Sequence, residues 1–296
     1  MRHLLDIDDL SRDEFLDVVA RCEQPSPPSV LAGKGAGLVF EKASGRTRNA
    51  TEMAVVQLGG HPISMRGDEV GIDTRETAED VVRALAGYHA IVGARVKDHS
   101  VLERMAALDA VPVLNLLSDR AHPCQAIADL LTLQARFGKL AGRRVAFVGD
   151  FNNVARSLAL ACAYAEVDFV VASPPAYGPD ATDLDRVALI GAPMQVVNHV
   201  DDAVKDADAV YTDVFVSMGQ EAEAEARRVA FEGFTVTRDV MANAAPHAVF
   251  LHCLPAIRGS EVEADVIEGP QSAVFAQAAK RLDAARGAIW WLVDHA

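Results

Sequence analysis

Residues 38–48 read Leu38-Val39-Phe40-Glu41-Lys42-Ala43-Ser44-Gly45-Arg46-Thr47-Arg48, an apolar run followed by a short turn and the start of a helix. Ser44 stands at an N-cap position, and a Gly59-Gly60 pair ends the helix that it opens. The N–H groups and the positive dipole end of such a helix favour an anion. The hydroxyls of Ser44 and Thr47 and the guanidinium of Arg46 add donors at the same place. The stretch therefore predicts a site for a phosphate-like group.

A plainer interpretation of this stretch is an N-cap followed by two surface arginines. Arg46 and Arg48 lie about 200° apart around a helix, so they cannot point at the same place. We therefore expect at least one of the two arginines to point inward.

Length and composition narrow the classes of protein. A chain of 296 residues predicts two domains of roughly 130 to 150 residues each. A net charge of −14 disfavours a nucleic-acid partner. No apolar run reaches the roughly 18 to 20 residues of a membrane span, and Met1–Leu10 does not resemble a signal peptide, so we expect a cytosolic protein that does not enter a membrane. The four cysteines show no metal-binding spacing and suggest thiols in a reducing compartment.

The first half of the chain alternates strands and helices. An amphipathic helix over residues 10–24 would turn Phe15, Leu16, Val18 and Val19 inward. Strands follow at 61–65, 90–96 and 111–117, helices at 77–88 and 100–108, and a long helix at 122–137. Nearly continuous apolar strands in this alternation predict an α/β fold with a parallel sheet covered by helices on both faces.

The pattern restarts near Arg143. Strands are predicted at 144–148, 168–172, 195–198, 209–212 and 248–251, with helices between them and a last helix over 272–293. The turn after the first of these strands lacks the GxGxxG sequence, so no dinucleotide site is predicted. The charged residues 221–228 are expected to form a solvent-facing helix start.

Unusual polar residues follow the ends of the predicted strands. Ligands of open parallel sheets bind at the carboxyl ends of the strands, so these side chains are candidates for a site. They are Arg95, His122 and Gln125 in the first half, and Asn152, Asn153, Asp213, the run Ser217-Met218-Gly219 and the run His252-Cys253-Leu254-Pro255 in the second. A single such residue is usually structural, but this many at strand ends favour a functional site.

Four motifs carry a resemblance to a known family. Ser44-Gly45-Arg46-Thr47-Arg48, His122-Pro123-Cys124-Gln125, Asp213-Val214-Phe215-Val216-Ser217-Met218-Gly219 and His252-Cys253-Leu254-Pro255 stand in the order and spacing of the transcarbamylases. The last two resemble the ornithine carbamoyltransferases in particular. The resemblance covers nearly the whole chain and implies the reaction of carbamoyl phosphate with L-ornithine to give L-citrulline and phosphate, a step of arginine biosynthesis.

The resemblance also implies which residues act. It implies a carbamoyl phosphate-binding domain over 1–137, an ornithine-binding domain over 138–275, long joining helices, and a C-terminal helix over 276–296 that packs back on the first domain. Implied carbamoyl phosphate-binding residues are Ser44, Gly45, Arg46, Thr47, Arg95, His122, Gln125 and Arg281; implied ornithine-binding residues are Asn153, Asp213, Ser217, Met218, Cys253 and Leu254; Arg95, His122, Cys253 and Asp213 would take part in catalysis. A homotrimer without metal or organic cofactor is implied.

The chain departs from the family pattern at Gly45, where a threonine is usual, and in the segment Gln277-Ala278-Ala279-Lys280-Arg281, which lacks the usual acidic residues. Gly45 could weaken carbamoyl phosphate binding, or could be required because a Cβ does not fit there. Two alternatives remain beside the ornithine enzyme: a transcarbamylase for a related amine such as lysine or an ornithine derivative, and a weakened paralogue that binds without turnover.

Overall fold

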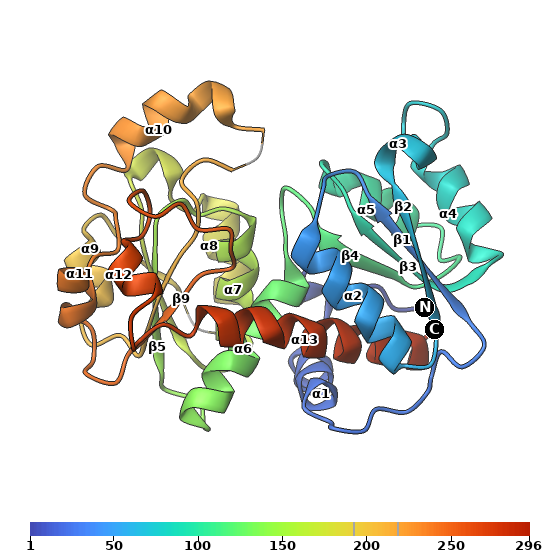
Figure 1. Ribbon diagram of the computed structural model, residues 1–296, viewed down its shortest axis with the longest axis horizontal. Helices are drawn as coiled ribbons and strands as arrows, with labels where there is room; N and C mark the ends of the chain where they lie inside the picture. The colour runs from blue at the N-terminus through green and yellow to red at the C-terminus, as the bar shows by residue number, and fades with distance from the viewer. Residues whose placement is uncertain (192, 218) are drawn as a thin grey trace. The chain divides into compact units, whose positions relative to one another are not determined.

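The computed structural model describes residues 1–191, 193–217 and 219–296, and Figure 1 shows its elements. The chain forms two compact units. Unit 1 consists of residues 1–131 and 279–296, and unit 2 of residues 132–278. Among the described residues, no helix has the length and apolar character needed to cross a membrane.

Unit 1 is built on a four-stranded sheet in the order β2-β1-β3-β4, with every neighbouring pair parallel. Its strands are β1 (Gly35–Phe40), β2 (His61–Arg66), β3 (His89–Arg95) and β4 (Val113–Leu117). Its helices are α1 (Arg12–Cys22), α2 (Gly45–Gln57), α3 (Gly67–Val70), α4 (Ala78–Ala86) and α5 (His99–Ala106), after the 3-10 turn η1 (Ile7–Asp9). Helices α6 (Pro123–Phe137) and α13 (Val274–Asp294) each belong to both units, so the chain passes between the units inside these two helices.

The sequence pattern explains how unit 1 is packed. Val39 of β1 belongs to a core cluster with Val82 of α4 and Leu102 of α5. Because successive side chains of a strand point to opposite faces, Leu38 faces the other side of the sheet, where it lies near Gly93 and Leu116. Both faces of β1 are therefore buried, as its apolar run predicts.

Unit 2 is built on a five-stranded parallel sheet in the order β7-β6-β5-β8-β9. Its strands are β5 (Arg144–Val148), β6 (Asp168–Ala172), β7 (Gln195–Val197), β8 (Ala209–Thr212) and β9 (Val249–Leu251). Its helices are α7 (Asn153–Tyr164), α8 (Ala181–Ile190), α9 (Val200–Val204), α10 (Ala224–Ala230), α11 (Arg238–Asn243) and α12 (Ala264–Ile267), with 3-10 turns η2 (Pro175–Tyr177) and η3 (Glu221–Glu223). In Figure 1, α7 and α8 lie on one side of this sheet and α9 and α11 on the other.

The predicted fold class is confirmed, because both units are parallel sheets with helices. One local prediction is wrong and another holds only in part. Leu16, predicted to point inward, is 40% exposed, whereas Phe15, Val18 and Val19 of the same helix are buried. A single buried stripe on α1 is filled by those three residues and Cys22, and Leu16 lies beside this stripe. The charged segment 221–228 is mostly exposed, as predicted, and the exception is Arg227, which is buried.

Helices α1 and α13 approach each other closely at Gly287. A Cβ added at Gly287 would clash with the Sγ atom of Cys22 and lie 2.8 Å from its backbone nitrogen. Arg286 of α13 strengthens the same contact by donating from Nη2 to the carbonyl of Cys22 at 2.9 Å. A glycine is therefore required where the two helix backbones meet.

We predict that Gly287→Ala destabilises the protein. Overpacking of this kind costs about 1 to 3 kcal/mol, which outweighs the roughly 1 kcal/mol by which alanine favours a helix over glycine. Thermal unfolding of the variant should show a lower midpoint. Gly45→Ala is the matched control, because no heavy atom lies within 4 Å of the Cβ position at Gly45. An unchanged or higher midpoint for Gly287→Ala would contradict the prediction.

Candidate functional site

The first turn of α2 is prepared for an anion. Ser44 is the N-cap residue, with extended backbone angles, but its side chain makes no capping hydrogen bond to the helix. Its hydroxyl instead accepts from Nη1 of Arg95 at 3.4 Å. The N–H groups of the first helical turn are therefore not used by the Ser44 side chain, and the dipole of α2 favours a negative charge beside them.

The expectation that Arg46 or Arg48 points inward is wrong, because both residues are exposed. The buried positions of α2 are Thr47, Thr51, Ala54 and Val55, which recur at helical spacing. Each arginine lies about 100° from Thr47 on either side, at the border of this buried stripe. Arg48 pairs with Glu52 one turn later, with 2.7 Å between Nε and Oε1.

Thr47 is the meeting point of two buried arginines. Nη2 of Arg281, on α13, donates to the Thr47 hydroxyl at 2.5 Å, and Nη1 of Arg95, at the end of β3, donates to it at 3.4 Å. All three side chains are buried. Two guanidinium groups that converge beside a helix N-terminus make this part of unit 1 strongly favourable for a multiply charged anion.

His122 lies next to the arginines as a neutral imidazole. Nη2 of Arg281 is 3.2 Å from Nε2 of His122, and since a guanidinium can only donate, Nε2 accepts and the ring proton is assigned to Nδ1. Burial, together with the positive charges of Arg281 and Arg95, holds the pKa of His122 well below its usual value. His122 can therefore serve as a hydrogen-bonding group without adding charge.

Gln125 supplies a hydrogen-bond acceptor, whereas the arginines supply donors. The side chain is fully buried, and its Nε2 donates to Oδ1 of Asp129 at 2.8 Å. Because Nε2 is the donor in this bond, the orientation of the amide is fixed and Oε1 remains as an acceptor. Within the described residues Oε1 accepts no hydrogen bond. An amide N–H of a ligand is its natural partner.

In unit 2, the carboxylate of Asp213 is held on both oxygens. Oδ1 accepts from the backbone N–H of Val214 at 2.8 Å and from the thiol of Cys253 at 3.1 Å. Oδ2 accepts from Nδ2 of Asn152 at 2.8 Å. Asp213 follows β8 and Cys253 follows β9, so the parallel sheet brings the two residues together at its carboxyl edge.

Asn152 is a candidate by its position after a strand, but it is not among the residues that the family resemblance implies. Besides its bond to Asp213, its Oδ1 caps α7 by accepting from the N–H groups of Val154 and Ala155 at 2.9 and 3.2 Å. Asn153, the predicted member of the pair, is the first residue of α7 and is half-buried. The preference for asparagine at an N-cap was the signal that could have separated the two positions.

His252 is fixed by its neighbours on both ring nitrogens. The backbone N–H of Leu254 donates to Nδ1 at 2.9 Å, so the ring proton lies on Nε2, which is 3.2 Å from the Glu261 carboxylate. The backbone N–H of His252 also donates to Oε1 of Gln277 at 2.9 Å. This buried network orients the turn that carries Cys253 and Leu254.

Asp213, His252 and Cys253 each have one possible metal-ligand atom within 4.8 Å of the others. Both ring nitrogens of His252 are already engaged, however, so Asp213 and Cys253 are the two donors that remain in this cluster. Zinc sites in proteins use at least three protein ligands. The cluster is therefore better described as a hydrogen-bonded arrangement that orients Cys253.

The other predicted residues of unit 2 lie in the loops beside this cluster. Ser217 is half-buried, and its backbone N–H donates to Oε1 of Gln220 at 3.0 Å. Leu254 is half-buried and has a left-handed backbone with φ of 60°. Met218 lies outside the described residues.

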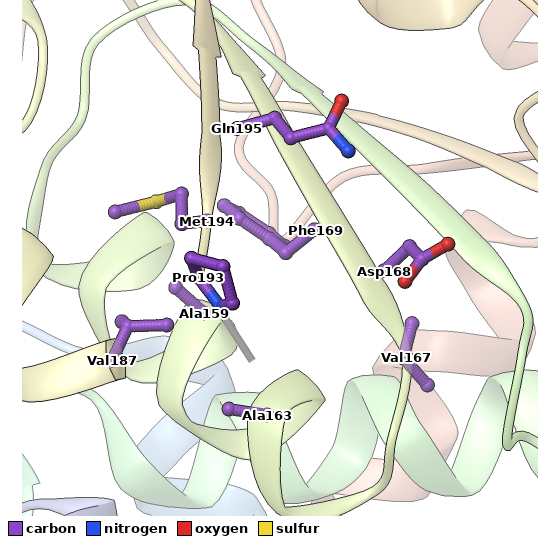
Figure 2. A pocket seen from close by; sticks show the side chains of 9 residues that line it. All are labelled: Ala159, Ala163, Val167, Asp168, Phe169, Val187, Pro193, Met194 and Gln195. Carbon is purple, nitrogen blue, oxygen red and sulfur yellow. The ribbon is translucent and has the colours of Figure 1, made fainter. Parts of the chain in front are cut away.

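A separate groove lies between α7, α8 and the starts of β6 and β7 (Figure 2). Asp168 and Gln195, the first residues of these two strands, lie on its border, and its remaining lining is mostly apolar. Because all strands of this sheet run in the same direction, the groove lies at the opposite edge from Asp213 and Cys253. It is therefore not part of the candidate site.

Comparisons with known proteins cover the chain from end to end. Residues 2–135 match the family model described as aspartate/ornithine carbamoyltransferase, carbamoyl-P binding domain, and residues 141–292 match the Asp/Orn binding domain of the same family. An ornithine carbamoyltransferase of Acidothermus cellulolyticus is 45% identical, covering 100% of this chain and 98% of its own length.

Two further relatives have solved structures. The anabolic ornithine carbamoyltransferase of Pyrococcus furiosus is 40% identical in sequence over 97% of this chain and 95% of its own. A solved structure of the P. furiosus ornithine carbamoyltransferase has a TM-score of 0.94 at 39% identity, with 100% and 98% covered. The crystal structure of an acetylornithine transcarbamylase complexed with acetylcitrulline has a TM-score of 0.88 at 28% identity, with 99% of each chain covered.

We predict that the low pKa of His122 makes the protein less stable in acid. Unfolded, a histidine titrates near pH 6.5. Below that pH the unfolded chain binds a proton at this histidine that the folded protein does not bind. The free energy of unfolding therefore falls as the pH falls. Above pH 6.5 the histidine is neutral in both the folded and the unfolded state, so it no longer changes the free energy of unfolding. One such group gives a slope of at most about 1.4 kcal/mol per pH unit.

The measurement is the pH dependence of unfolding between pH 5 and 7.5 for wild type, His122→Asn and, as the control, His61→Asn at an exposed histidine. The slope should be smaller in His122→Asn and unchanged in His61→Asn. Some slope should remain, because burial also lowers the pKa of His89. Equal slopes in all three proteins would mean that His122 does not contribute.

Proposed function

The chain belongs to the aspartate/ornithine carbamoyltransferase family, and from this premise we propose that it transfers the carbamoyl group of carbamoyl phosphate to L-ornithine. The products would be L-citrulline and phosphate, and the reaction would serve arginine biosynthesis, as the anabolic relative suggests. The observation that carries the proposal is the convergence of Arg281 and Arg95 on Thr47 at the start of α2, beside neutral His122.

Carbamoyl phosphate contains a phosphate dianion and an amide, and unit 1 offers partners for both ends. We propose that Ser44, the Gly45 amide, Arg46, Thr47 and Arg281 bind the phosphate. Arg95, Thr47, His122 and Gln125 would bind the carbamoyl group, with Oε1 of Gln125 accepting from its amide N–H. During the reaction the carbonyl oxygen gains negative charge and phosphate departs, so donors held in place at both oxygens lower the barrier.

Unit 2 offers partners for an amino acid that carries a second amine. We propose that Asp213, Asn153, Ser217 and Met218 bind the α-amino and carboxylate groups of ornithine. Cys253, Leu254 and Asp213 would position the side-chain amine. That amine must be neutral to attack, and its desolvation beside the buried Cys253 favours loss of the proton. Orientation of two bound substrates supplies the other part of the catalysis.

Assembly and location belong to the same proposal. We propose a homotrimer, as the family resemblance implies, in which the segment after Arg95 (Val96–Ser100) meets a neighbouring subunit. A cytoplasmic location is supported by the four cysteines, which are buried thiols in the structure. Light scattering at micromolar concentration tests the assembly, and an active monomer would contradict it.

Two alternatives differ from this proposal in specific features. A related amine remains a candidate substrate because the similar structure of acetylornithine transcarbamylase carries an ornithine derivative on the same fold. A weakened paralogue is suggested by Gly45 alone, and the buried positions of Thr47, Arg95, His122 and Arg281 argue against it.

We predict that the purified protein forms citrulline from carbamoyl phosphate and L-ornithine without added metal or cofactor. Lysine, putrescine and N-acetylornithine should react at least tenfold more slowly, because the proposed contacts suit a free α-amino acid of ornithine length. Citrulline formation is measured by colorimetry or mass spectrometry for each amine at equal concentration. A faster reaction with another amine would support the first alternative, and no reaction with any amine would support the second.

We also predict that Gly45→Thr lowers the Michaelis constant for carbamoyl phosphate by about tenfold or more. A hydrogen bond to a charged group contributes roughly 1.5 to 3 kcal/mol, and a Cβ has open space at this position. The Michaelis constant for ornithine should stay nearly unchanged. Gly45→Ala is the control, since it stiffens the helix without adding a hydroxyl. A lower melting temperature together with weaker carbamoyl phosphate binding in Gly45→Thr would show that glycine is required here.

A further inference from the structure

Arg227 of α10 is a buried arginine outside the set of residues proposed to bind substrate. Its Nη1 donates to Oδ2 of Asp150 at 2.9 Å and to the carbonyl oxygen of Phe215 at 3.0 Å. Its Nε donates to Glu223 at 3.1 Å, and its guanidinium carbon lies 4.8 Å from the ring centre of Tyr177. One side chain thus contacts two carboxylates, a backbone carbonyl and an aromatic ring.

These partners come from loops that follow three neighbouring strands. Tyr177 follows β6, Asp150 follows β5 and Phe215 follows β8, and these strands are adjacent in the order β6-β5-β8. The loops also contact each other: the backbone N–H of Phe151 donates to the carbonyl of Tyr177 at 2.9 Å. Arg227 therefore ties together three loops at the edge of the sheet where Asp213 lies.

The bond to Phe215 acts on the loop that the proposed ornithine site uses. Phe215 stands midway between Asp213 and Ser217, so fixing its carbonyl restricts the path of the chain between two proposed ligands. The ring of Phe215 stacks on Phe231 at 4.5 Å between centres and 9° between planes, which holds the same residue from its other side. A shift of the Phe215 backbone would therefore disturb both its bond to Arg227 and its stacking on Phe231.

We propose that Arg227 is a positioning residue for the amino-acid substrate: by holding the Phe215 carbonyl, it keeps residues 213–217 in the conformation that binds ornithine. This inference rests on the proposed function of unit 2. Arg227 does not touch the substrate in this account, and its effect reaches the substrate through the loop. The expected consequence is selective, because the partners of Arg227 all lie in unit 2 and the carbamoyl phosphate residues lie in unit 1.

The chemistry of arginine suits this role better than that of lysine. A guanidinium provides several donors in one plane and also stacks on an aromatic ring, whereas an ammonium is a compact point charge.

The pair with Asp150 also affects the charge of that carboxyl group. Burial raises the pKa of Asp150, and the charge of Arg227 opposes this effect, so removing Arg227 alone leaves a poorly compensated carboxylate.

The test compares four variants in steady-state kinetics with both substrates varied. Arg227→Met removes every donor, Arg227→Lys keeps only the charge, and Arg227→Met combined with Asp150→Asn removes both buried charges. Arg228→Met is the matched control, because Arg228 is the adjacent residue and pairs only at the surface with Glu225 among the described contacts.

We expect Arg227→Met to raise the Michaelis constant for ornithine at least tenfold while that for carbamoyl phosphate changes less than twofold. The double variant should keep the raised constant, Arg227→Lys should lie between wild type and Arg227→Met, and Arg228→Met should match wild type. An unchanged ornithine constant in Arg227→Met would overturn the proposal. Recovery in the double variant would also overturn it, because Arg227 would then serve only to compensate Asp150.

Hydrogen exchange of the substrate-free protein gives a readout that does not depend on activity. Peptides covering residues 213–217 should exchange faster in Arg227→Met than in wild type or Arg228→Met. Equal exchange would overturn the inference even if activity fell. If wild type forms no citrulline, the proposed function fails, and the exchange experiment still decides whether Arg227 holds the loop.

Discussion

The hydroxyl of Thr47 is the contact on which the organisation of unit 1 depends. It accepts hydrogen bonds from Arg95 at the end of β3 and from Arg281 on α13, residues separated by most of the chain. Buried guanidinium groups are costly unless their donors are satisfied. Arg281 and Arg95 each meet part of this demand at Thr47, which occupies the inward position of α2.

Much of the fold follows from patterns that the sequence displays. The apolar run before Ser44, the glycine pair after α2 and the regular alternation of strands and helices predict two parallel sheets, and the structure confirms them. The direction of an arginine side chain does not follow from these patterns. Helical spacing shows that Arg46 and Arg48 diverge, but the face that is buried depends on Ala54 and Val55, two turns further along α2. The residues next to Arg46 and Arg48 therefore do not decide whether either side chain is buried.

Unit 2 contains residues whose contacts the sequence does not predict. Asp213 and Cys253 are predictable from their positions after strands, because a parallel sheet gathers such residues at one edge. Asn152 and Arg227 act through contacts between loops, and nothing in their local sequence indicates the partner. Arg227 lies in a run of charged residues whose default interpretation is an exposed surface. Its buried guanidinium pairs with Asp150, which is 77 positions away in sequence.

The two units present opposite electrostatics, and this contrast favours the proposed reaction over simple binding. Unit 1 gathers buried guanidinium groups, a helix N-terminus and a neutral imidazole, which suit a dianion. Unit 2 gathers a carboxylate held by Asn152 and a thiol, which suit an ammonium group and a desolvated amine. The chain carries a net charge of −14, so the cations around Thr47 are a local exception to its overall charge. Because the reaction consumes one anion and one amine, each unit is chemically matched to one of its two substrates.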